Sequence, residues 1–168
     1  MKFLKPTMLC LALVAFFTAT AIPVAAGGGS AAPPAATGKD LWNYLTHVKY
    51  QESFALWPGK GKLYKGTEPH GMLLTTYVNK TALGSIQGKK GTMPVGAIVV
   101  KENYKPDKKL AAITVMYKVA GFNPEAGDWF WVKYAPDGTI QKEGKVGGCI
   151  GCHGKAKGND FLFTGELK

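Results

Sequence analysis

The chain has 168 residues and a formal net charge of +10, and all 21 of its basic residues are lysine. The absence of arginine argues against nucleic-acid binding, because arginine supplies the bidentate contacts to bases and phosphates in such complexes. We interpret the lysines either as a solvated surface or as a positive field that steers the protein towards an acidic partner or an anionic membrane face.

The first 26 residues have the three parts of a secretory signal peptide. Lys2 and Lys5 form the charged region, residues 8–21 form an apolar run, and small residues precede the expected cleavage site after Ala26. The apolar run is shorter than the roughly 20 residues that span a bilayer, which disfavours a retained membrane anchor. Cys10 lies inside this run, so we expect it to be removed with residues 1–26.

Residues 27–38 consist of glycine, alanine, proline, serine and threonine, a composition that predicts a flexible linker with nothing to bury. Residues 39–168 remain, which are enough for one domain with one hydrophobic core. Without the signal peptide the chain keeps 19 lysines against 11 acids, a net charge of +8.

Residues 37–57 are predicted to form a helix. Thr37 and Asp40 have the spacing of a capping box, although aspartate is shorter than the preferred glutamate or glutamine. Apolar residues then recur at helical spacing, and Pro58-Gly59 ends the element.

Five later segments have the character of strands. The turn sequence Pro-Asp-Gly at 136–138 separates the last two segments and predicts a hairpin. Sequential strands with short connections imply a mainly antiparallel sheet, so the predicted fold class is α+β, with helices flanking the sheet. The predicted strands are Met72–Val78, Gly96–Glu102, Leu110–Val119, Trp129–Tyr134 and Thr139–Glu143.

Residues 149–153 read Cys-Ile-Gly-Cys-His, the attachment signature of c-type haem. Each cysteine sulfur can add to one porphyrin vinyl group, while the imidazole of His153 binds the iron. The alternatives are a thioredoxin-like redox pair or half a zinc site. A zinc site needs a further cluster, but His47 and His70 are scattered, and a thioredoxin motif lies early in a βαβ unit. We therefore expect one haem c per chain, attached covalently through Cys149 and Cys152 on a short C-terminal helix packed against the sheet.

The haem motif and the signal peptide require each other, because covalent haem attachment takes place outside the bacterial inner membrane. The sequence therefore predicts a periplasmic protein. Once residues 1–26 are removed, both remaining cysteines belong to the motif, so we expect no structural disulfide.

Several blocks together resemble one family, the cytochrome P460 family, which includes the cytochromes c′-beta. The resemblance covers nearly the whole chain after the linker. Its blocks are Glu68–Gly71, Tyr77–Asn79, Pro94–Tyr104, Thr114–Lys118, Gly127–Trp131 and the C-terminal haem motif.

This resemblance implies a homodimer with a mainly antiparallel sheet, and a haem bound by one histidine, here His153, with an open distal side. Cytochromes P460 proper carry a bond from a lysine to the porphyrin rim and oxidise hydroxylamine. Cytochromes c′-beta lack that bond, have an apolar distal pocket and bind nitric oxide or carbon monoxide. Lys101 matches the cross-linking lysine, and strand alternation places it on the same side as Ala97 and Val99. The ordinary alternative is that Lys101, near the strand end, extends its ammonium group into water.

Hydroxylamine-oxidising members place an arginine and an acid near the distal side. This chain has no arginine, which places full P460 catalysis in doubt. Glu102 and Glu125 are candidates for a proton acceptor, although we expect surface solvation for each.

Five aromatic residues are candidates for the surroundings of the haem. Phe54, Phe122 and Phe130 are expected either in an apolar distal wall or, more often for aromatics in a protein of this size, in the core. Trp129 and Trp131 share one strand face, so they are expected to line the haem or to form a dimer contact.

A sixth iron ligand would make the protein a low-spin electron carrier, and the candidates for it are His70, Met72, Met93 and Met116. We favour a structural role for His70, such as a hydrogen bond that fixes its loop, because the resemblance does not imply an axial ligand there. Met116 is expected in the core.

Three functions follow, in order of preference. The first is a five-coordinate haem that binds nitric oxide or related small ligands and exchanges electrons with a redox partner protein. The second is a hydroxylamine-oxidising cytochrome P460 with a lysine–haem cross-link, and the third is a six-coordinate electron-transfer cytochrome. Whether the protein is an enzyme stays open at this point; if it is one, we expect an oxidoreductase acting on hydroxylamine or nitric oxide.

Overall fold

The computed structural model describes residues 1–2, 33–67 and 69–168. Apart from Met1 and Lys2, the predicted signal peptide lies outside the described residues, as do residues 27–32 of the predicted linker. Among the described residues no helix has the length and apolar character needed to cross a membrane.

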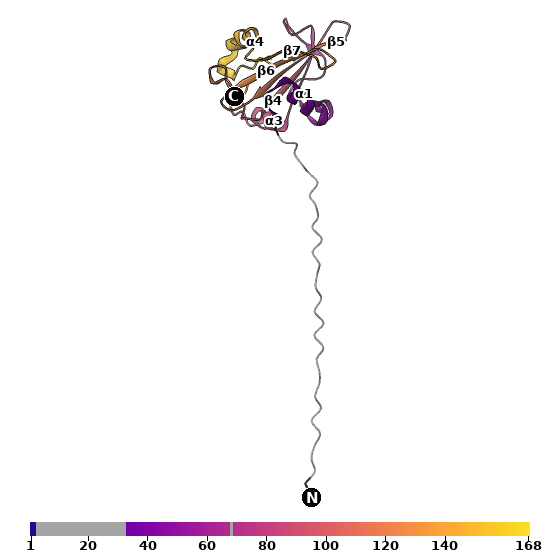
Figure 1. The fold of residues 1–168 in the computed structure, drawn as a ribbon, viewed down its shortest axis with the longest axis vertical. Helices are drawn as coiled ribbons and strands as arrows, with labels where there is room; N and C mark the ends of the chain where they lie inside the picture. Colours follow the sequence, from indigo (N-terminus) through magenta and orange to yellow (C-terminus); the bar gives the residue numbers. More distant parts are fainter. Residues whose placement is uncertain (3–32, 68) are drawn as a thin grey trace. The chain divides into compact units, whose positions relative to one another are not determined.

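Among the described residues, the folded domain is built around an antiparallel sheet of seven strands. Figure 1 shows its strands β4 to β7 side by side. The strands pair in the order β1-β3-β4-β5-β6-β7, and β2 pairs with β3 beside β1. Four helices flank the sheet, so the predicted α+β fold with a mainly antiparallel sheet is confirmed. The strands are β1 Ala55–Leu56, β2 Tyr64–Lys65, β3 Leu73–Val78, β4 Ile98–Tyr104, β5 Leu110–Lys118, β6 Trp129–Tyr134 and β7 Ile140–Gly144. The helices are α1 Gly38–His47, α2 Tyr50–Ser53, α3 Lys80–Gln87 and α4 Gly147–His153, with 3-10 turns at Pro124–Ala126 and Gly154–Asn159.

The five predicted strands all form, and the hairpin of β6 and β7 is confirmed. The predicted helix over residues 37–57 is wrong in its second half. Thr37 caps α1 as expected, since its hydroxyl accepts the Asp40 N–H at 3.1 Å. Lys49 then takes a left-handed conformation, with φ at 49°, which interrupts the helical path. After the short α2 the chain turns extended and pairs with β3.

The predicted linker ends earlier than expected. The carbonyl oxygen of Pro34 accepts a hydrogen bond from the Tyr117 hydroxyl at 3.0 Å, and that of Gly38 accepts one from the Tyr134 hydroxyl at 2.8 Å. Ala36 packs against the core between these two points. Residues 34–38 therefore belong to the folded domain.

Side-chain alternation along the strands divides the core between the two faces of the sheet. We call them the α1 face and the α4 face, after the helices that pack on them. Leu41 and Leu45 of α1 pack on the α1 face, against Tyr77, Ile98, Val100, Ile113, Val115, Tyr117, Phe130, Val132 and Tyr134. The core of the α4 face contains Val99, Met116, Trp129 and Trp131, together with Ala82 and Ile86 of α3, and Cys149 and Ile150 of α4 pack against it.

The expectation that Glu102 is a solvated surface acid is wrong. Its side chain is fully buried on the α1 face, where it accepts hydrogen bonds from the Tyr50 hydroxyl at 2.8 Å, the Tyr104 hydroxyl at 2.6 Å and the Gln51 amide. Burial, followed by the nearby carboxylate, raises the pKa of Tyr50 above its ordinary value, so this hydroxyl remains a donor. A buried carboxylate is tolerated only with such partners, so Glu102 is a structural residue that joins α2 to the sheet.

Candidate functional site

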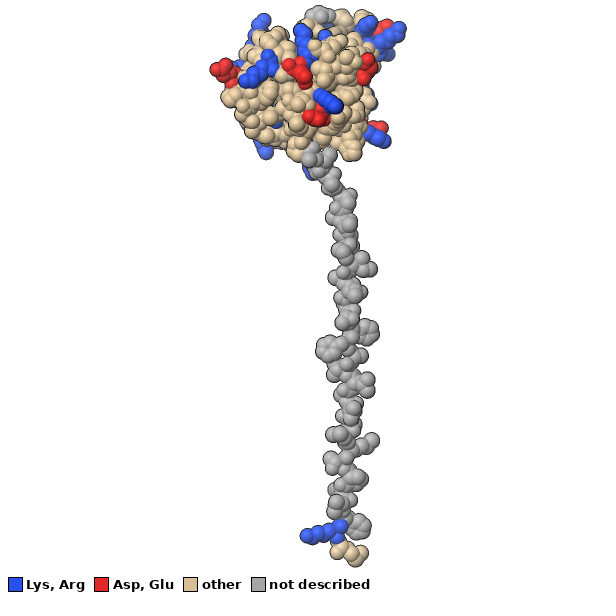
Figure 2. Space-filling view, viewed as in Figure 1, with Lys and Arg blue, Asp and Glu red and all other residues tan. Residues whose placement is uncertain are grey.

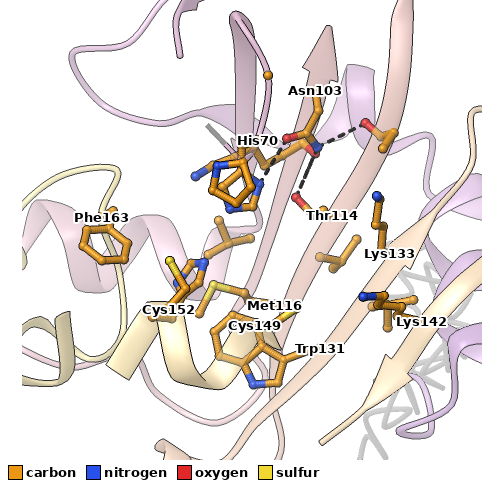
Figure 3. Close-up of a pocket in the computed structure, with 18 of the residues that line it drawn as sticks. His70, Asn103, Thr114, Met116, Trp131, Lys133, Lys142, Cys149, Cys152 and Phe163 are labelled. Carbon is orange, nitrogen blue, oxygen red and sulfur yellow. Dashed lines mark hydrogen bonds between the residues drawn. The ribbon is translucent and has the colours of Figure 1, made fainter. Parts of the chain in front are cut away.

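A cavity of about 440 Å³ lies between α4, the α4 face of strands β4 to β7 and two loop segments, residues 69–71 and 162–164 (Figure 3). This volume is within the range of pockets that hold cofactors and small ligands. Val99, Met116 and Trp131 form one row across β4, β5 and β6 and give the cavity an apolar floor.

Helix α4 brings the three residues of the haem motif to this cavity. Cys149 and Cys152 lie three residues apart on the helix, so their side chains share one face, and both line the cavity. Both are half-buried and neither forms a disulfide. His153, the last residue of α4, is buried and lines the same cavity. The predicted pair of thiols and the predicted ligand are therefore adjacent.

A carbonyl group fixes the orientation of the His153 ring. Its Nδ1 lies 2.7 Å from the carbonyl oxygen of Phe161, which can only accept, so Nδ1 carries the proton and donates. The ring packs edge to face against Trp131 and Phe163, with centroid distances of 4.7 and 5.4 Å. Burial lowers the pKa of His153 below its ordinary value, which favours the neutral imidazole. Nε2 is left with a free lone pair, as a metal-binding histidine requires.

The acceptor of this hydrogen bond belongs to a turn that an ion pair holds in place. Lys118 Nζ lies 2.7 and 2.9 Å from the two carboxylate oxygens of Asp160, and both side chains are nearly buried. The Asp160 carboxylate also accepts the N–H of Met93 at 2.7 Å, and its carbonyl accepts the Trp129 indole N–H at 3.0 Å. Asp160 and Phe161 both have left-handed backbones, so these contacts stabilise an uncommon turn beside His153.

Lys101 lies on the α4 face of β4 and lines the cavity, on the side that strand alternation predicted. Burial lowers its pKa to about 8. The structure therefore places Lys101 in the wall of the same cavity as Cys149, Cys152 and His153.

Two further lysines continue the row that Lys101 begins. Lys101 is paired in register with Thr114, Thr114 with Lys133, and Lys133 with Lys142 on β7. All four residues line the cavity, and Figure 3 shows Lys133 and Lys142 together at one side of it. Like charges directly opposite each other on neighbouring strands are unfavourable unless an anion compensates them. The two carboxylates of a haem match this requirement, so the donor set, the volume and the charge of the cavity all fit a haem.

His70 also lines the cavity. Its ring is perpendicular to that of His153, with 5.8 Å between the ring centroids, and its Nδ1 lies 3.2 Å from Asn103 Oδ1. The hydrogen bond that we expected to fix its loop is therefore present. Burial, followed by Lys101, lowers the pKa of His70 to about 4. Of the candidate methionines, Met116 lines the cavity, Met93 is buried in the core and Met72 is 48% exposed.

Other candidate residues lie elsewhere. Phe130 is buried in the core of the α1 face, and Phe54 and Phe122 pack against it. The core role that we favoured is therefore confirmed, and the alternative of a distal wall is wrong. Trp129 and Trp131 are 0% and 3% exposed, which excludes the proposed dimer contact through them. Trp131 lines the cavity, whereas Trp129 is not among the residues that line it.

Neither candidate acid lies at the cavity. Glu125 is exposed in the Pro124–Ala126 turn, and Glu102 is buried on the opposite face. Sequence reasoning missed Asn103, Lys133 and Phe163 as lining residues. Alternation from Lys101 and Trp131 would have indicated Asn103 and Lys133, but no pattern marks Phe163.

A comparison with family models found a match to Cytochrome P460 over residues 52–164, which include the whole sheet, α4 and every residue that lines the cavity. No curated protein matches the chain. The match covers more than half of the chain and confirms the resemblance seen in its sequence blocks. The chain therefore belongs to the cytochrome P460 family, and its cofactor is haem.

Proposed function

We propose that the protein is a periplasmic monohaem cytochrome that binds nitric oxide or a related small ligand and exchanges electrons with a partner protein. Cys149 and Cys152 would attach the haem covalently, and His153 would bind its iron. The observation that carries this proposal is the position of the His153 ring. It donates Nδ1–H to Phe161 and keeps Nε2 free beside the two thiols in one cavity.

Each part of the cavity has a distinct task in this function. When bound, the haem would supply an iron that binds one small ligand and that changes between the ferric and ferrous states by one electron. The apolar row Val99, Met116 and Trp131 limits water near it, and Lys133 and Lys142 would bind the propionates.

The proposal is tested by absorption spectroscopy of the protein produced with haem-maturation machinery. We expect a haem that stays with the polypeptide after denaturation, and a ferrous spectrum that changes on addition of nitric oxide. A spectrum that nitric oxide leaves unchanged would contradict the binding function. A haem that is lost on denaturation would contradict the covalent attachment.

The position of Lys101 favours a second function, the oxidation of hydroxylamine by a lysine-linked haem. The linking bond would join Nζ of Lys101 to a porphyrin rim carbon and replace one N–H and one C–H bond. Its formation is therefore a two-electron oxidation, which needs an external oxidant such as hydrogen peroxide. A lowered pKa increases the share of neutral, nucleophilic amine on Lys101.

Peptide mass analysis of the haem-bearing fragment separates the two functions. The second function predicts that the Lys101 peptide stays joined to the fragment of Cys149 and Cys152, and that the Soret band is strongly red-shifted. Lys101→Leu should abolish both signs, whereas Lys133→Leu, two strands away in the same row, should keep them. A fragment with two cysteine attachments and no joined lysine peptide excludes the cross-link.

The remaining assignments rest on the sequence. The signal peptide supports a periplasmic location, and the family resemblance supports a homodimer. Figure 2 shows lysine and acidic side chains interspersed on the face that it draws. On that face the mixture of charges favours a solvated lysine surface over one concentrated docking patch.

A further inference from the structure

We infer that Tyr104 and Glu102 form a second redox site, which acts together with the iron to reduce a peroxide. Tyr104 supplies one electron, and the carboxylate of Glu102 takes up the phenolic proton. The inference rests on the proposed function, because it requires an iron held in the cavity. It adds an activity towards an oxidant to the binding of small ligands.

The site lies directly behind the wall of the cavity. Lys101 and Asn103 of β4 line the cavity on the α4 face, and Glu102, between them on the strand, points to the opposite face. Tyr104 follows on the side of Glu102. Its carbonyl oxygen would lie 3.0 Å from a Cβ atom at Gly71, a residue of the loop that lines the cavity. The backbone of β4 therefore joins the pair to the cavity.

A hydrogen bond already connects the two groups. The Tyr104 hydroxyl donates to Oε2 of Glu102 at 2.6 Å, a length typical of strong bonds to an ionised acceptor. Tyr50 donates to Oε1 at 2.8 Å, and the Gln51 amide donates to the same oxygen, so the carboxylate is fixed from both sides. Glu102 is 0% exposed, whereas Tyr104 is half-buried. A proton leaving Tyr104 can thus move along this bond to a base that is held in place.

The environment keeps the phenol intact until an electron is removed. Burial, followed by the hydrogen bond to Glu102, raises the pKa of Tyr104 above its ordinary value. Loss of an electron reverses this preference, because an oxidised phenol is a strong acid and its buried cation is costly. Tyr117, on the same face of the sheet, has no such base as its partner. Its hydroxyl donates to the carbonyl oxygen of Pro34 at 3.0 Å, and a carbonyl group is too weak a base to take the proton.

The number of electrons gives the tyrosine its task. Conversion of one hydrogen peroxide to two water molecules takes two electrons and two protons. A ferrous haem loses one electron in becoming ferric, so the second electron must come from elsewhere. The O–H bond of Tyr104 breaks, its electron passes to the oxidant at the iron, and its proton goes to Glu102, which becomes a carboxylic acid. Solvent supplies the two protons of the water molecules.

The position of Tyr104 also protects the cavity. An oxidising equivalent that stays beside the iron meets Met116, which lines the cavity and whose thioether is readily oxidised. Transfer to Tyr104 moves that equivalent behind the sheet, to a ring that is half-buried and that an external reductant can reach.

The test mixes the reduced holoprotein with equimolar hydrogen peroxide and records the frozen sample by electron paramagnetic resonance. We expect a tyrosyl radical whose hyperfine pattern changes when ring-deuterated tyrosine is incorporated. Tyr104→Phe should lose this signal, and Glu102→Gln should lose most of it, since glutamine keeps an acceptor oxygen but is a much weaker base. Tyr117→Phe is the matched control and should keep the signal. Repeated additions of peroxide should bleach the haem of Tyr104→Phe faster than that of the wild type.

A radical that persists in Tyr104→Phe, or whose pattern follows deuterated tryptophan, would overturn the inference. Ferric iron that forms in the wild type without any radical would overturn it too, and the labelled wild type decides this point even if a variant fails to fold. The proposed function would survive either result as long as nitric oxide changes the ferrous spectrum. A haem that is lost on denaturation, or that ignores nitric oxide, would refute the proposed function itself.

Discussion

Replacement of both Cys149 and Cys152 by alanine is expected to convert a permanently attached haem into one that acid and organic solvent extract. The two thiols are the covalent anchors in our proposal, and α4 presents both to the cavity that holds His153. Each attachment adds the sulfur and hydrogen of a thiol across one vinyl double bond, so no electrons leave the pair. With both sulfurs absent, the iron–histidine bond and the cavity contacts are the remaining bonds to the cofactor.

The measurement is a haem stain of the denatured polypeptide, together with its mass. The wild type should carry the mass of one haem through denaturation, and the double variant should carry none. Either single variant should keep one attachment and stain more weakly. Pigment that stays on the denatured double variant would contradict the attachment to these cysteines.

His153→Ala is the matched control for this experiment, because it removes the iron ligand and keeps both thiols. We expect that variant to retain a stainable, covalent haem with an altered spectrum. The two variants therefore separate attachment from ligation.

The haem motif and the strand alternation could be read from the sequence because both are local. Cys149, Cys152 and His153 lie within one and a half turns of one helix. The side of the sheet on which Lys101 lies follows from the alternation of side chains along its strand. The three phenylalanine candidates lie away from the cavity, because both faces of this sheet are apolar and either face can bury an aromatic side chain. Phe130 alternates with Trp129 and Trp131, so it faces away from the cavity.

Features that depend on distant pairing could not be read from the sequence. The row from Lys101 to Lys142 requires the register of three strand pairs, and two of the three partners of Glu102 come from α2, about fifty residues earlier. In the sequence Asn103 is an ordinary strand residue, and its role is seen only from its contact with His70, 33 residues earlier. These contacts join residues far apart in the sequence, so no short window of sequence contains both partners.

The buried ion pair behind the haem ligand gives the second large expected effect. Lys118→Met should lower the free energy of unfolding of the holoprotein by about 3–5 kcal/mol, because it leaves the Asp160 carboxylate buried without its cation. The side chains of Lys118 and Asp160 are 10% and 8% exposed, so water cannot replace the lost contact. The ammonium group also lies 4.7 Å from the Trp129 ring, an attraction that methionine removes as well. Urea denaturation measures this change.

The double variant Lys118→Met with Asp160→Asn is the control, since it removes both charges together, keeps an acceptor oxygen for the Met93 N–H and places at this position a residue that tolerates a left-handed backbone. We expect it to recover much of the lost stability, because the cost arises from an unpaired buried charge and not from the absence of a salt bridge. Equal instability of the single and double variants would contradict this explanation, because removing the unpaired charge would then restore nothing.

Lys118→Met should also change the reduction potential of the iron, although Lys118 is not among the residues that line the cavity. Asp160 and Phe161 form the turn whose carbonyl accepts the His153 Nδ1–H at 2.7 Å. A looser turn weakens that hydrogen bond, which makes His153 a poorer electron donor and destabilises ferric iron relative to ferrous. The reduction potential of Lys118→Met should therefore rise above that of the wild type in a redox titration. An unchanged potential in a destabilised variant would show that the turn stabilises the fold without tuning His153.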